Sequence, residues 1–276
     1  MLFHDVVILM RGGGDLATGV ALRLKRAGFP LAVLELPRPL VVRRAVALAS
    51  AVHQGSIEVE GVRGVLVSSV EAARAQLWDD HTVPVLVDPT GETLLAFAPT
   101  VLVDARMAKR NIDTRMDQAP LVVALGPGFE AGRDCHAVVE TNRGHWLGRV
   151  YWQGSAEPDT GTPGVVAGHG AERVLRAPVA GTVRTLAEIG QQVDAGQVVA
   201  EVEGVPVRAP FPGVVRGLIA DGTQVPAGLK IGDIDPRGKR EHCFTVSDKA
   251  LAVGGGVLEA VLTWLNWRAS GTRGKP

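Results

Sequence analysis

Residues 6–19 read VVILMRGGGDLATG, which is an apolar run, three glycines and the start of a helical pattern. Such an apolar run is typical of a strand buried in a parallel sheet. Glycines in the following turn allow the backbone to approach an anion at the start of a helix. Apolar residues at helical spacing extend this helix to Ala27, and Gly28 is its expected end. The segment therefore predicts a strand, a phosphate-binding turn and a helix in succession.

A second apolar run, residues 31–36, contains an acidic residue, Glu35. Dinucleotide-binding units place an acid about 20 residues after the glycine turn, where it bonds to a ribose. We therefore expect a Rossmann-like N-terminal domain with a parallel sheet over residues 1–152. The alternative is that the glycines only form a tight turn and that Glu35 pairs with a nearby arginine. The candidate cofactor-binding residues of this part are Gly12, Gly13, Gly14, Asp15 and Glu35.

Three later apolar runs also end in polar residues or glycines. They stop at Asp88, at Asp104 and at a loop that contains Gly126 and Gly128. In an open parallel sheet, ligands collect outside the carboxyl ends of the strands. Gly126 and Gly128 are therefore further candidates for cofactor binding, with the two aspartates and Lys109 in the same crevice. Alternatively, Asp and Gly end these strands for conformational reasons alone.

A dense polar cluster follows on a short strand, where residues 135–148 read CHAVVETNRGHWLG. Glu140 can act as a general acid or base, Arg143 can grip an anion and His145 can carry a proton. These three residues are the first candidates for catalysis. The same side chains could equally form a hydrogen-bonded corner that fixes the packing of the chain.

An internal repeat follows, because RAPVAGTVR at residues 176–184 returns as RAPFPGVVR at residues 208–216. Two copies of short strands and turns suit a small β-module with pseudo-twofold symmetry. The pattern resembles a biotinyl/lipoyl-type barrel-sandwich hybrid, expected here over residues 172–237. Such carrier domains present a lysine at the hairpin between their halves, but residues 200–207, AEVEGVPV, contain none. A swinging cofactor arm is therefore not expected, and we interpret the module as a docking or covering element.

Residues 153–171 are rich in Gly, Pro and Thr and form the expected linker to this module. At the end of the module, Asp233 and Asp235 alternate along a strand and so share one face. They could bind Mg²⁺ or grip arginines, or simply lie in a solvated turn paired with Arg237. The chain contains no cysteine or histidine motif with the spacing of a structural zinc site, so we assign no metal ligands.

Two further helices are expected. Pro39 suits the first turn of a helix that runs to about Val52. A C-terminal helix is expected over residues 245–268, opened by Ser247-Asp248-Lys249. Three glycines, residues 254–256, weaken this second helix but permit close approach of a backbone or a ligand.

The composition of the chain restricts its function class. Its 276 residues suggest two domains or one large one, and its 29 basic and 29 acidic residues give no net charge. A general nucleic-acid-binding surface is therefore not expected. No signal peptide and no apolar run of about 18 residues occurs, so no membrane span is expected. The two cysteines cannot form a disulfide framework, and we expect a cytoplasmic protein.

Taken together, these motifs give a resemblance to the YqeB-type accessory proteins of selenium-dependent molybdenum hydroxylases. The matching stretches are residues 13–19, 125–132, 140–149, 173–178, 233–237 and 247–250. The resemblance implies a maturation factor that binds molybdenum cofactor (molybdopterin) or a nucleotide and assists its modification or insertion. A client molybdenum hydroxylase is then the expected partner, and a homo-oligomer stays open. If selenium or sulfur chemistry takes place, a thiolate should take part, and Cys135 is the candidate closest to Glu140.

The principal alternative is an NAD(P)-dependent oxidoreductase, in which Glu35 would bind the cofactor ribose. Asp15 places a carboxylate at the start of the first helix, which suits the helix dipole but would repel a close phosphate. No substrate domain typical of a dehydrogenase follows the glycine turn. A nucleotide or pterin phosphate is therefore the preferred ligand over NAD.

Overall fold

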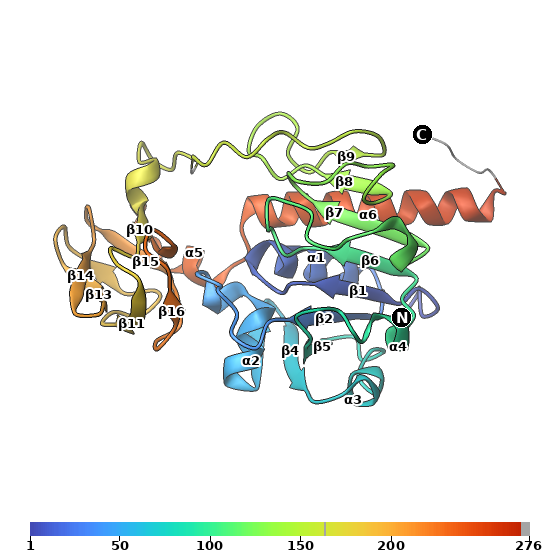
Figure 1. Ribbon diagram of the computed structural model, residues 1–276, viewed down its shortest axis with the longest axis horizontal. Coiled ribbons are helices and arrows are strands. Elements are labelled where there is room, and N and C mark those ends of the chain that lie inside the picture. The colour runs from blue at the N-terminus through green and yellow to red at the C-terminus, as the bar shows by residue number, and fades with distance from the viewer. Residues whose placement is uncertain (163, 272–276) are drawn as a thin grey trace.

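The protein consists of a large mixed α/β unit and a smaller β-module, which lie side by side (Figure 1). The computed structural model describes residues 1–162 and 164–271. The expected linker of residues 153–171 forms the long connection between the two parts, and its residue Pro163 lies outside the described residues.

The α/β unit is built on one nine-stranded sheet with the strand order β3-β4-β5-β2-β1-β6-β7-β8-β9. All neighbouring pairs are parallel except β3 with β4 and β8 with β9. The direction in which successive strands are added changes between β1 and β6. Strands β2 to β5 lie on one side of β1, and strands β6 to β9 follow on its other side. The strands are β1 (Ile8–Arg11), β2 (Leu31–Glu35), β3 (Ser56–Val59), β4 (Val62–Val67), β5 (Thr82–Val87), β6 (Val101–Asp104), β7 (Leu121–Leu125), β8 (Ala137–Val139) and β9 (Val150–Tyr151).

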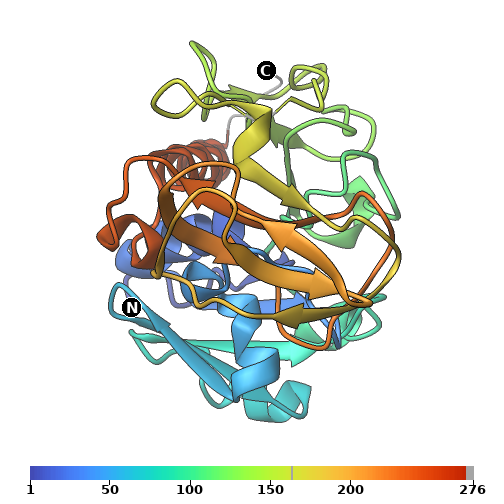
Figure 2. The same cartoon turned by 90° about the vertical axis from the view of Figure 1, so that its left-hand side faces the viewer.

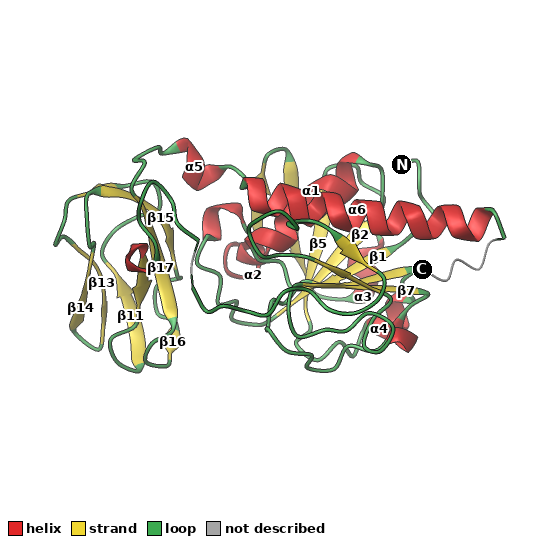
Figure 3. Ribbon diagram, turned by 90° about the horizontal axis from the view of Figure 1, so that it is seen from above, coloured by secondary structure: helices red, strands yellow, loops and turns green. Residues whose placement is uncertain are grey.

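Helices cover both faces of this sheet, and alternate side chains of each buried strand pack into two separate cores. Figure 3 shows α1 (Asp15–Arg26) and α6 (Asp248–Ala269) on one face. The shorter helices α3 (Val70–Arg74) and α4 (Leu94–Phe97) pack on the other. On strand β1, for example, Ile8 and Met10 face α1 and α6, whereas Leu9 faces the opposite core.

Close packing of α1 on α6 depends on glycine. A Cβ atom added at Gly19 would lie 2.4 Å from the Ala250 carbonyl oxygen. One added at Gly254 would lie 2.5 Å from the Gly19 carbonyl oxygen. Gly254 of the C-terminal helix therefore allows the backbone of α1 to approach closely. The sequence predicted close approach of either a backbone or a ligand. Helix α6 begins as expected, because the Ser247 side chain accepts a hydrogen bond from the Ala250 amide at 3.2 Å.

The segment Glu241–Ala269, which includes α5 (Glu241–Phe244) and α6, is long and apolar enough to cross a membrane by length and composition. The sequence patterns had not led us to expect such a segment. Its residues Val253, Val257 and Val261 are buried in the core of the α/β unit. Of its most apolar 18-residue window, 39% is buried, so packing in this core accounts for part of the apolar character of α6.

The single helix expected from Pro39 to Val52 is wrong. The segment forms two short 3-10 turns, Arg44–Val46 and Leu48–Ser50, and the short helix α2 (Ala51–Gln54). Its backbone amides bond to other parts of the chain: Ala49 N donates to Gly13 O at 2.8 Å and Leu48 N to the Thr18 hydroxyl at 3.0 Å. These tertiary bonds replace the bonds that a regular helix would make.

The β-module consists of two four-stranded antiparallel sheets, seen face-on in Figure 2. Their strand orders are β10-β17-β15-β12 and β14-β13-β11-β16. A shift of 32 residues converts one order into the other, so each sheet combines strands from both copies of the repeat. The strands are β10 (Val174–Arg176), β11 (Gly181–Thr185), β12 (Gln192–Val193), β13 (Val198–Val202), β14 (Val205–Arg208), β15 (Gly213–Leu218), β16 (Gln224–Val225) and β17 (Lys230–Asp235).

Candidate functional site

The glycine turn after β1 is closed by groups of the protein itself. The Gly13 amide donates to Glu35 Oε2 at 2.7 Å, and the Leu36 amide donates to Glu35 Oε1 at 2.7 Å. Burial raises the pKa of this carboxyl group. A Cβ atom at Gly13 would lie 2.9 Å from the Ala49 amide nitrogen, so the segment after β2 covers the turn. Glu35 therefore holds the turn, and both its oxygens are engaged within the protein.

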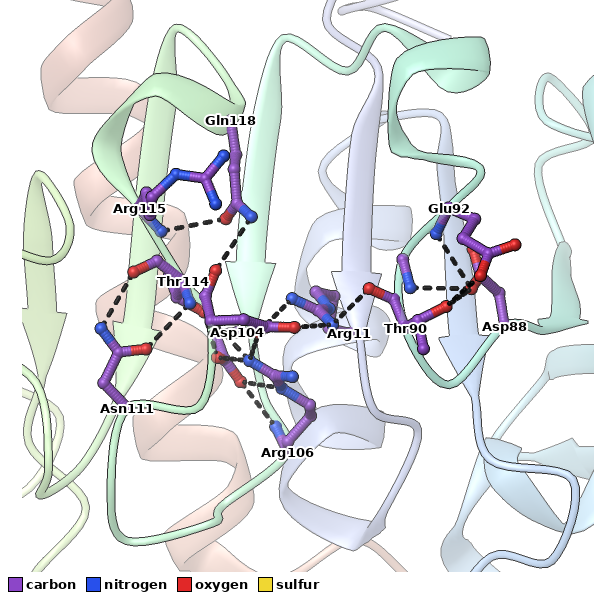
Figure 4. Close-up of polar contacts among 12 residues, drawn as sticks. Arg11, Asp88, Thr90, Glu92, Asp104, Arg106, Asn111, Thr114, Arg115 and Gln118 are labelled. Atoms are coloured by element: carbon purple, nitrogen blue, oxygen red, sulfur yellow. Dashed lines mark hydrogen bonds and ion pairs between the residues drawn. The ribbon is translucent and has the colours of Figure 1, made fainter.

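A network of ion pairs fills the sheet edge where the strand order reverses (Figure 4). Arg11, at the end of β1 and only 2% exposed, binds both oxygens of Asp113 at 2.6 and 2.9 Å. Arg106 pairs with Asp113 at 2.7 Å and with Asp104, at the end of β6, at 2.6 Å. Asp88 accepts hydrogen bonds from the amides of the turn that follows it. These aspartates are saturated by protein partners, so the bare strand ends are not the best ligand site.

Gly126 and Gly128 serve close approach of neighbouring segments. Both have positive φ angles, 73° and 99°. A Cβ atom at Gly126 would lie 2.4 Å from the Thr141 hydroxyl oxygen, and one at Gly128 would lie 2.4 Å from the Arg110 amide nitrogen. Their loop thereby brings the segments around Lys109 and Glu140 together.

The catalytic candidates occupy very different environments. Glu140 is fully buried and accepts hydrogen bonds from the amides of Asn142 and Glu157 at 2.6 and 2.7 Å. Arg143 makes a bidentate ion pair with Asp248 at 2.7 and 2.8 Å, which holds the pKa of that carboxyl group far below its usual range. His145 is exposed and contacts the edge of a tryptophan ring.

Cys135 lies in the second core with no exposed surface. Burial raises the pKa of its thiol to about 12. The reactive form of cysteine is the thiolate. This environment does not favour one, so the structure gives no support to a nucleophilic role for Cys135.

Lys249, the second residue of α6, interacts with both the glycine-turn motif and the polar cluster that contains Glu140. Its positive charge interacts with Asp15 of the glycine turn and with Glu140. Burial and the nearby Arg143 lower its pKa. Over residues 1–162 and 164–271, its ammonium group makes no hydrogen bond or ion pair. Asp15, Glu140 and Arg143, separate in the sequence, thus lie within electrostatic range of one cation that has no bonded partner among the described residues.

The β-module adds two more cations at this place. Arg216 on β15 has a side chain 12% exposed, and its nearest carboxylate oxygen, on Asp235, lies 3.8 Å away. Lys230, the first residue of β17, interacts electrostatically with Asp15 and Arg216. Burial lowers the pKa of both groups. Within the described parts of the chain, neither side chain makes a hydrogen bond.

Arg43 completes the group from the α/β unit. It is 8% exposed, and its Nη2 donates to the carbonyl oxygens of His242 and Thr245 at 3.0 Å each. Its Nη1 lies 3.4 Å from Asp15, but its Nε is buried and has no hydrogen-bond partner in the part of the chain that the structure describes. We refer to these residues as the junction cluster, which comprises Asp15, Arg43, Arg216, Lys230 and Lys249.

Of this cluster, sequence reasoning named Asp15 as a site residue, and it placed Arg43 near the end of the second strand, where it could contact a phosphate or lie on a solvated face. Lys249 belongs to the Ser-Asp-Lys motif noted above, and Arg216 to the repeat, so both lay in recognised motifs without a role. Asp233 and Asp235 grip Arg173 and Arg237, one of the alternatives considered for them. Among the described residues, no group of three or more His, Cys, Asp or Glu side chains could hold a metal.

Two surface hollows of the molecule lie elsewhere. One of about 330 Å³ lies at the ends of β4 and β5, beside Ser69, Asp88 and Thr93. Another of about 280 Å³ lies on the β-module between β10 and β14. Both are open and lack a group of unpaired buried charges, so we place the candidate site at the junction cluster on chemical grounds.

Fold and site together describe a two-part α/β protein with excess buried positive charge where its parts meet. No family model matches the chain. The chain is 48% identical over 270 residues, 98% of its length, to a protein of Escherichia coli named "Uncharacterized protein YqeB". It spans only 50% of that relative's length.

Two solved structures are distantly similar in shape. The product-bound ectoine utilization protein EutE (DoeB) from Ruegeria pomeroyi has 12% identity and a TM-score of 0.23, over 82% of this chain and 56% of that one. An aspartoacylase family protein from Mesorhizobium loti has 9% identity and a TM-score of 0.27, over 83% and 84%. Likenesses this weak carry no argument about the site.

Proposed function

We propose that the chain is an accessory protein for maturation of selenium-dependent molybdenum hydroxylases and binds its ligand at the junction cluster. The ligand is molybdenum cofactor or a nucleotide, either of which carries a phosphate. In this proposal the large sheet belongs to a Rossmann-like unit. The β-module is a biotinyl/lipoyl-like barrel-sandwich hybrid that covers the ligand and carries nothing covalently.

The observation that carries this proposal is the environment of Lys249. A half-buried ammonium group without a bonded partner is costly unless an anion joins it. The same lysine interacts with Asp15 and Glu140, residues of two motifs on which the resemblance rests. A bound anion beside it would be held between the α/β unit and the β-module.

An NAD(P)-dependent oxidoreductase is less well supported. In that reading Glu35 must offer its carboxylate to a ribose, but it already accepts bonds from Gly13 and Leu36. Ala49 packs on the same turn. A dinucleotide could reach the turn only after these contacts had been broken.

The test is to isolate the protein from cells with an intact molybdenum-cofactor pathway and to oxidise any retained pterin to its fluorescent form. We expect the wild-type protein to retain pterin or a nucleotide. Lys249→Met should retain about tenfold less, since a charge-assisted contact is lost. The matched control is Lys239→Met, because Lys239 is exposed and lies outside the junction cluster.

Three results would contradict the proposal. One is the absence of any pterin or nucleotide from the wild-type protein. Another is equal retention by the wild-type protein and Lys249→Met. The third is saturable binding of NAD or NADP that Glu35→Ala weakens, which would favour the oxidoreductase instead.

A further inference from the structure

The repeat provides an internal comparison for Arg216. Its equivalent in the first copy, 32 residues earlier, is Arg184. Arg184 is exposed and donates to Glu201 Oε2 through Nε and Nη2 at 3.2 and 2.6 Å. The equivalent of Glu201 in the second copy is Asp233, but that carboxylate pairs with Arg173. Arg216 therefore lacks the partner that the repeat gives to Arg184.

The backbone also differs between the two copies at this point. Arg184 lies in a regular pairing of β11 with β13, directly opposite Glu201. The pairing of β15 with β17 shifts between Val215 and Gly217, so Arg216 lies in a β-bulge. Bulges redirect a side chain and are frequent next to functional sites. The side chain of Arg216 is only 12% exposed, against 67% for Arg184.

The bulge directs this part of β15 toward the α/β unit. A Cβ atom at Gly217 would lie 2.9 Å from Val42 Cγ1, and the Leu218 amide donates to the Val42 carbonyl oxygen at 2.9 Å. Arg43, the next residue along, thereby comes close enough to Arg216 for their charges to interact. The two guanidinium groups come from different parts of the molecule and meet where those parts touch.

Lys230 supplies the third cation, where the first copy of the repeat has the apolar Val198. Its ammonium group interacts electrostatically with Arg216, Arg173 and the two acids Asp15 and Asp233. The nearby carboxylates already have partners: Asp233 pairs with Arg173, Asp15 with Arg43, and Asp235 with Arg237 and, at 3.8 Å, with Arg216. Positive charge is therefore in excess here, and among the described residues Arg43 Nε and Arg216 Nε are buried without a hydrogen-bond partner.

We propose that Arg216, Lys230 and Arg43 form a phosphate subsite, so that the β-module grips the phosphate of the bound ligand. This inference rests on the proposed function and adds the part of the chain that recognises the anion. Guanidinium groups match phosphate oxygens geometrically, and a multiply charged anion offsets the repulsion among three cations, of which Arg43 is buried and Arg216 and Lys230 are partly buried. The module then binds its ligand without covalent attachment, which explains why its hairpin needs no lysine.

The subsite is tested with inorganic phosphate on the full chain, against chloride at matched ionic strength. We expect phosphate to raise the melting temperature more than chloride does. Arg216→Gln and Lys230→Gln should each weaken phosphate binding about tenfold or more by calorimetry. Arg184→Gln is the matched control and should bind phosphate as the wild-type protein does.

Folding is checked separately, because Arg216 is largely buried. Circular dichroism should match the wild type for each variant, and Arg216→Lys should restore part of the binding. The proposal is overturned if phosphate stabilises no more than chloride, or if Arg184→Gln weakens binding as much as Arg216→Gln does.

The origin of the phosphate is resolved with a nucleoside monophosphate and the corresponding nucleoside. Arg216-dependent binding that is tighter for the nucleotide than for inorganic phosphate assigns the subsite to an organic phosphate ligand. Equal, Arg216-dependent binding of both assigns it to free phosphate. If pterin is retained equally by the wild type and Arg216→Gln and phosphate has no effect, the subsite is wrong while the proposed function stands. If phosphate binds as expected but no pterin or nucleotide is retained, only the proposed function fails.

Discussion

Lys25 on α1 is a buried charged residue, and no carboxylate of residues 1–162 or 164–271 bonds to it. Its ammonium group donates to the carbonyl oxygens of Leu77 and Asp79 at 3.2 and 2.6 Å, and burial lowers its pKa to about 8. An unfolded lysine keeps a pKa of about 10.4. Between these two values the unfolded chain binds more protons than the folded chain, so the contribution of this group to stability rises with pH.

We therefore expect the free energy of unfolding of the wild type, relative to Lys25→Met, to rise between about pH 8 and pH 10. The slope should not exceed roughly 1.4 kcal/mol per pH unit. Urea denaturation of both proteins across this range measures it. A difference that stays constant with pH would show that Lys25 remains charged in the folded protein.

Cys135 gives a second prediction at this scale. Its thiol is fully buried and has a pKa of about 12, and Cys243 is also buried with a raised pKa. A disulfide reagent at neutral pH should therefore label neither cysteine in the native protein and both after denaturation. Cys135→Ala should leave ligand retention unchanged. Rapid labelling of the native protein, or loss of ligand in this variant, would restore Cys135 as a reactive residue.

Single residues were the hardest part of the site to predict. The sequence identifies Glu140 and Arg143 as polar residues at the end of a strand. It does not reveal that Glu140 accepts hydrogen bonds from backbone amides and that Arg143 pairs with Asp248. Lys249 lies in an ordinary helix start, and only packing brings its charge within electrostatic range of Asp15. Burial and missing partners are properties of the folded chain, so a pattern of residue types cannot reveal them.

At the scale of elements, the contact of α1 with α6 is the most constrained. The added Cβ of Gly254→Ala would meet the Gly19 backbone at 2.5 Å, and a backbone cannot move aside easily. We expect this change to lower stability by about 1–3 kcal/mol. Gly255→Ala is the control: nothing lies within 4 Å of its added Cβ, so helix propensity should raise stability by about 0.5–1 kcal/mol. Thermal unfolding compares them, and equal effects would refute the close contact.

Elements with a clear period were predictable. The apolar run before the glycines forms β1, the helical pattern after them forms α1, and residues 31–35 form β2. The segment from Pro39 to Val52 was not predictable. Its amides bond to Gly13 and Thr18, and these partners become available only once the fold is complete.

At the scale of the whole molecule, Arg44 ties the two parts together. Its Nε donates to the Leu218 carbonyl oxygen on β15 at 2.6 Å. We expect Arg44→Ala to loosen the β-module from the α/β unit while both stay folded. Small-angle scattering should give a larger radius of gyration, and ligand retention should fall. Arg115→Ala is the control, because Arg115 is exposed and pairs with Asp117; an unchanged radius for Arg44→Ala would mean that other contacts hold the parts together.

The arrangement of the two parts was beyond sequence reasoning. The repeat predicted a pseudo-twofold module, and the two sheets do share one strand order. It did not predict which side of the module meets the α/β unit. On that side the two copies differ: Arg216 lies in a bulge, and Lys230 replaces a valine. Only the structure shows that these differences lie where the module meets the α/β unit.

The sharing of strands between the two sheets of the β-module has a consequence for its history and its folding. Neither copy of the repeat can complete a sheet alone, because each sheet needs two strands from each copy. The module is in effect a dimer joined into one polypeptide. A peptide of a single copy should therefore associate with a second such peptide or stay unfolded. Because both copies lie in one polypeptide, they can also differ: Arg184 makes a surface ion pair, whereas its equivalent Arg216 lies in a bulge near the α/β unit.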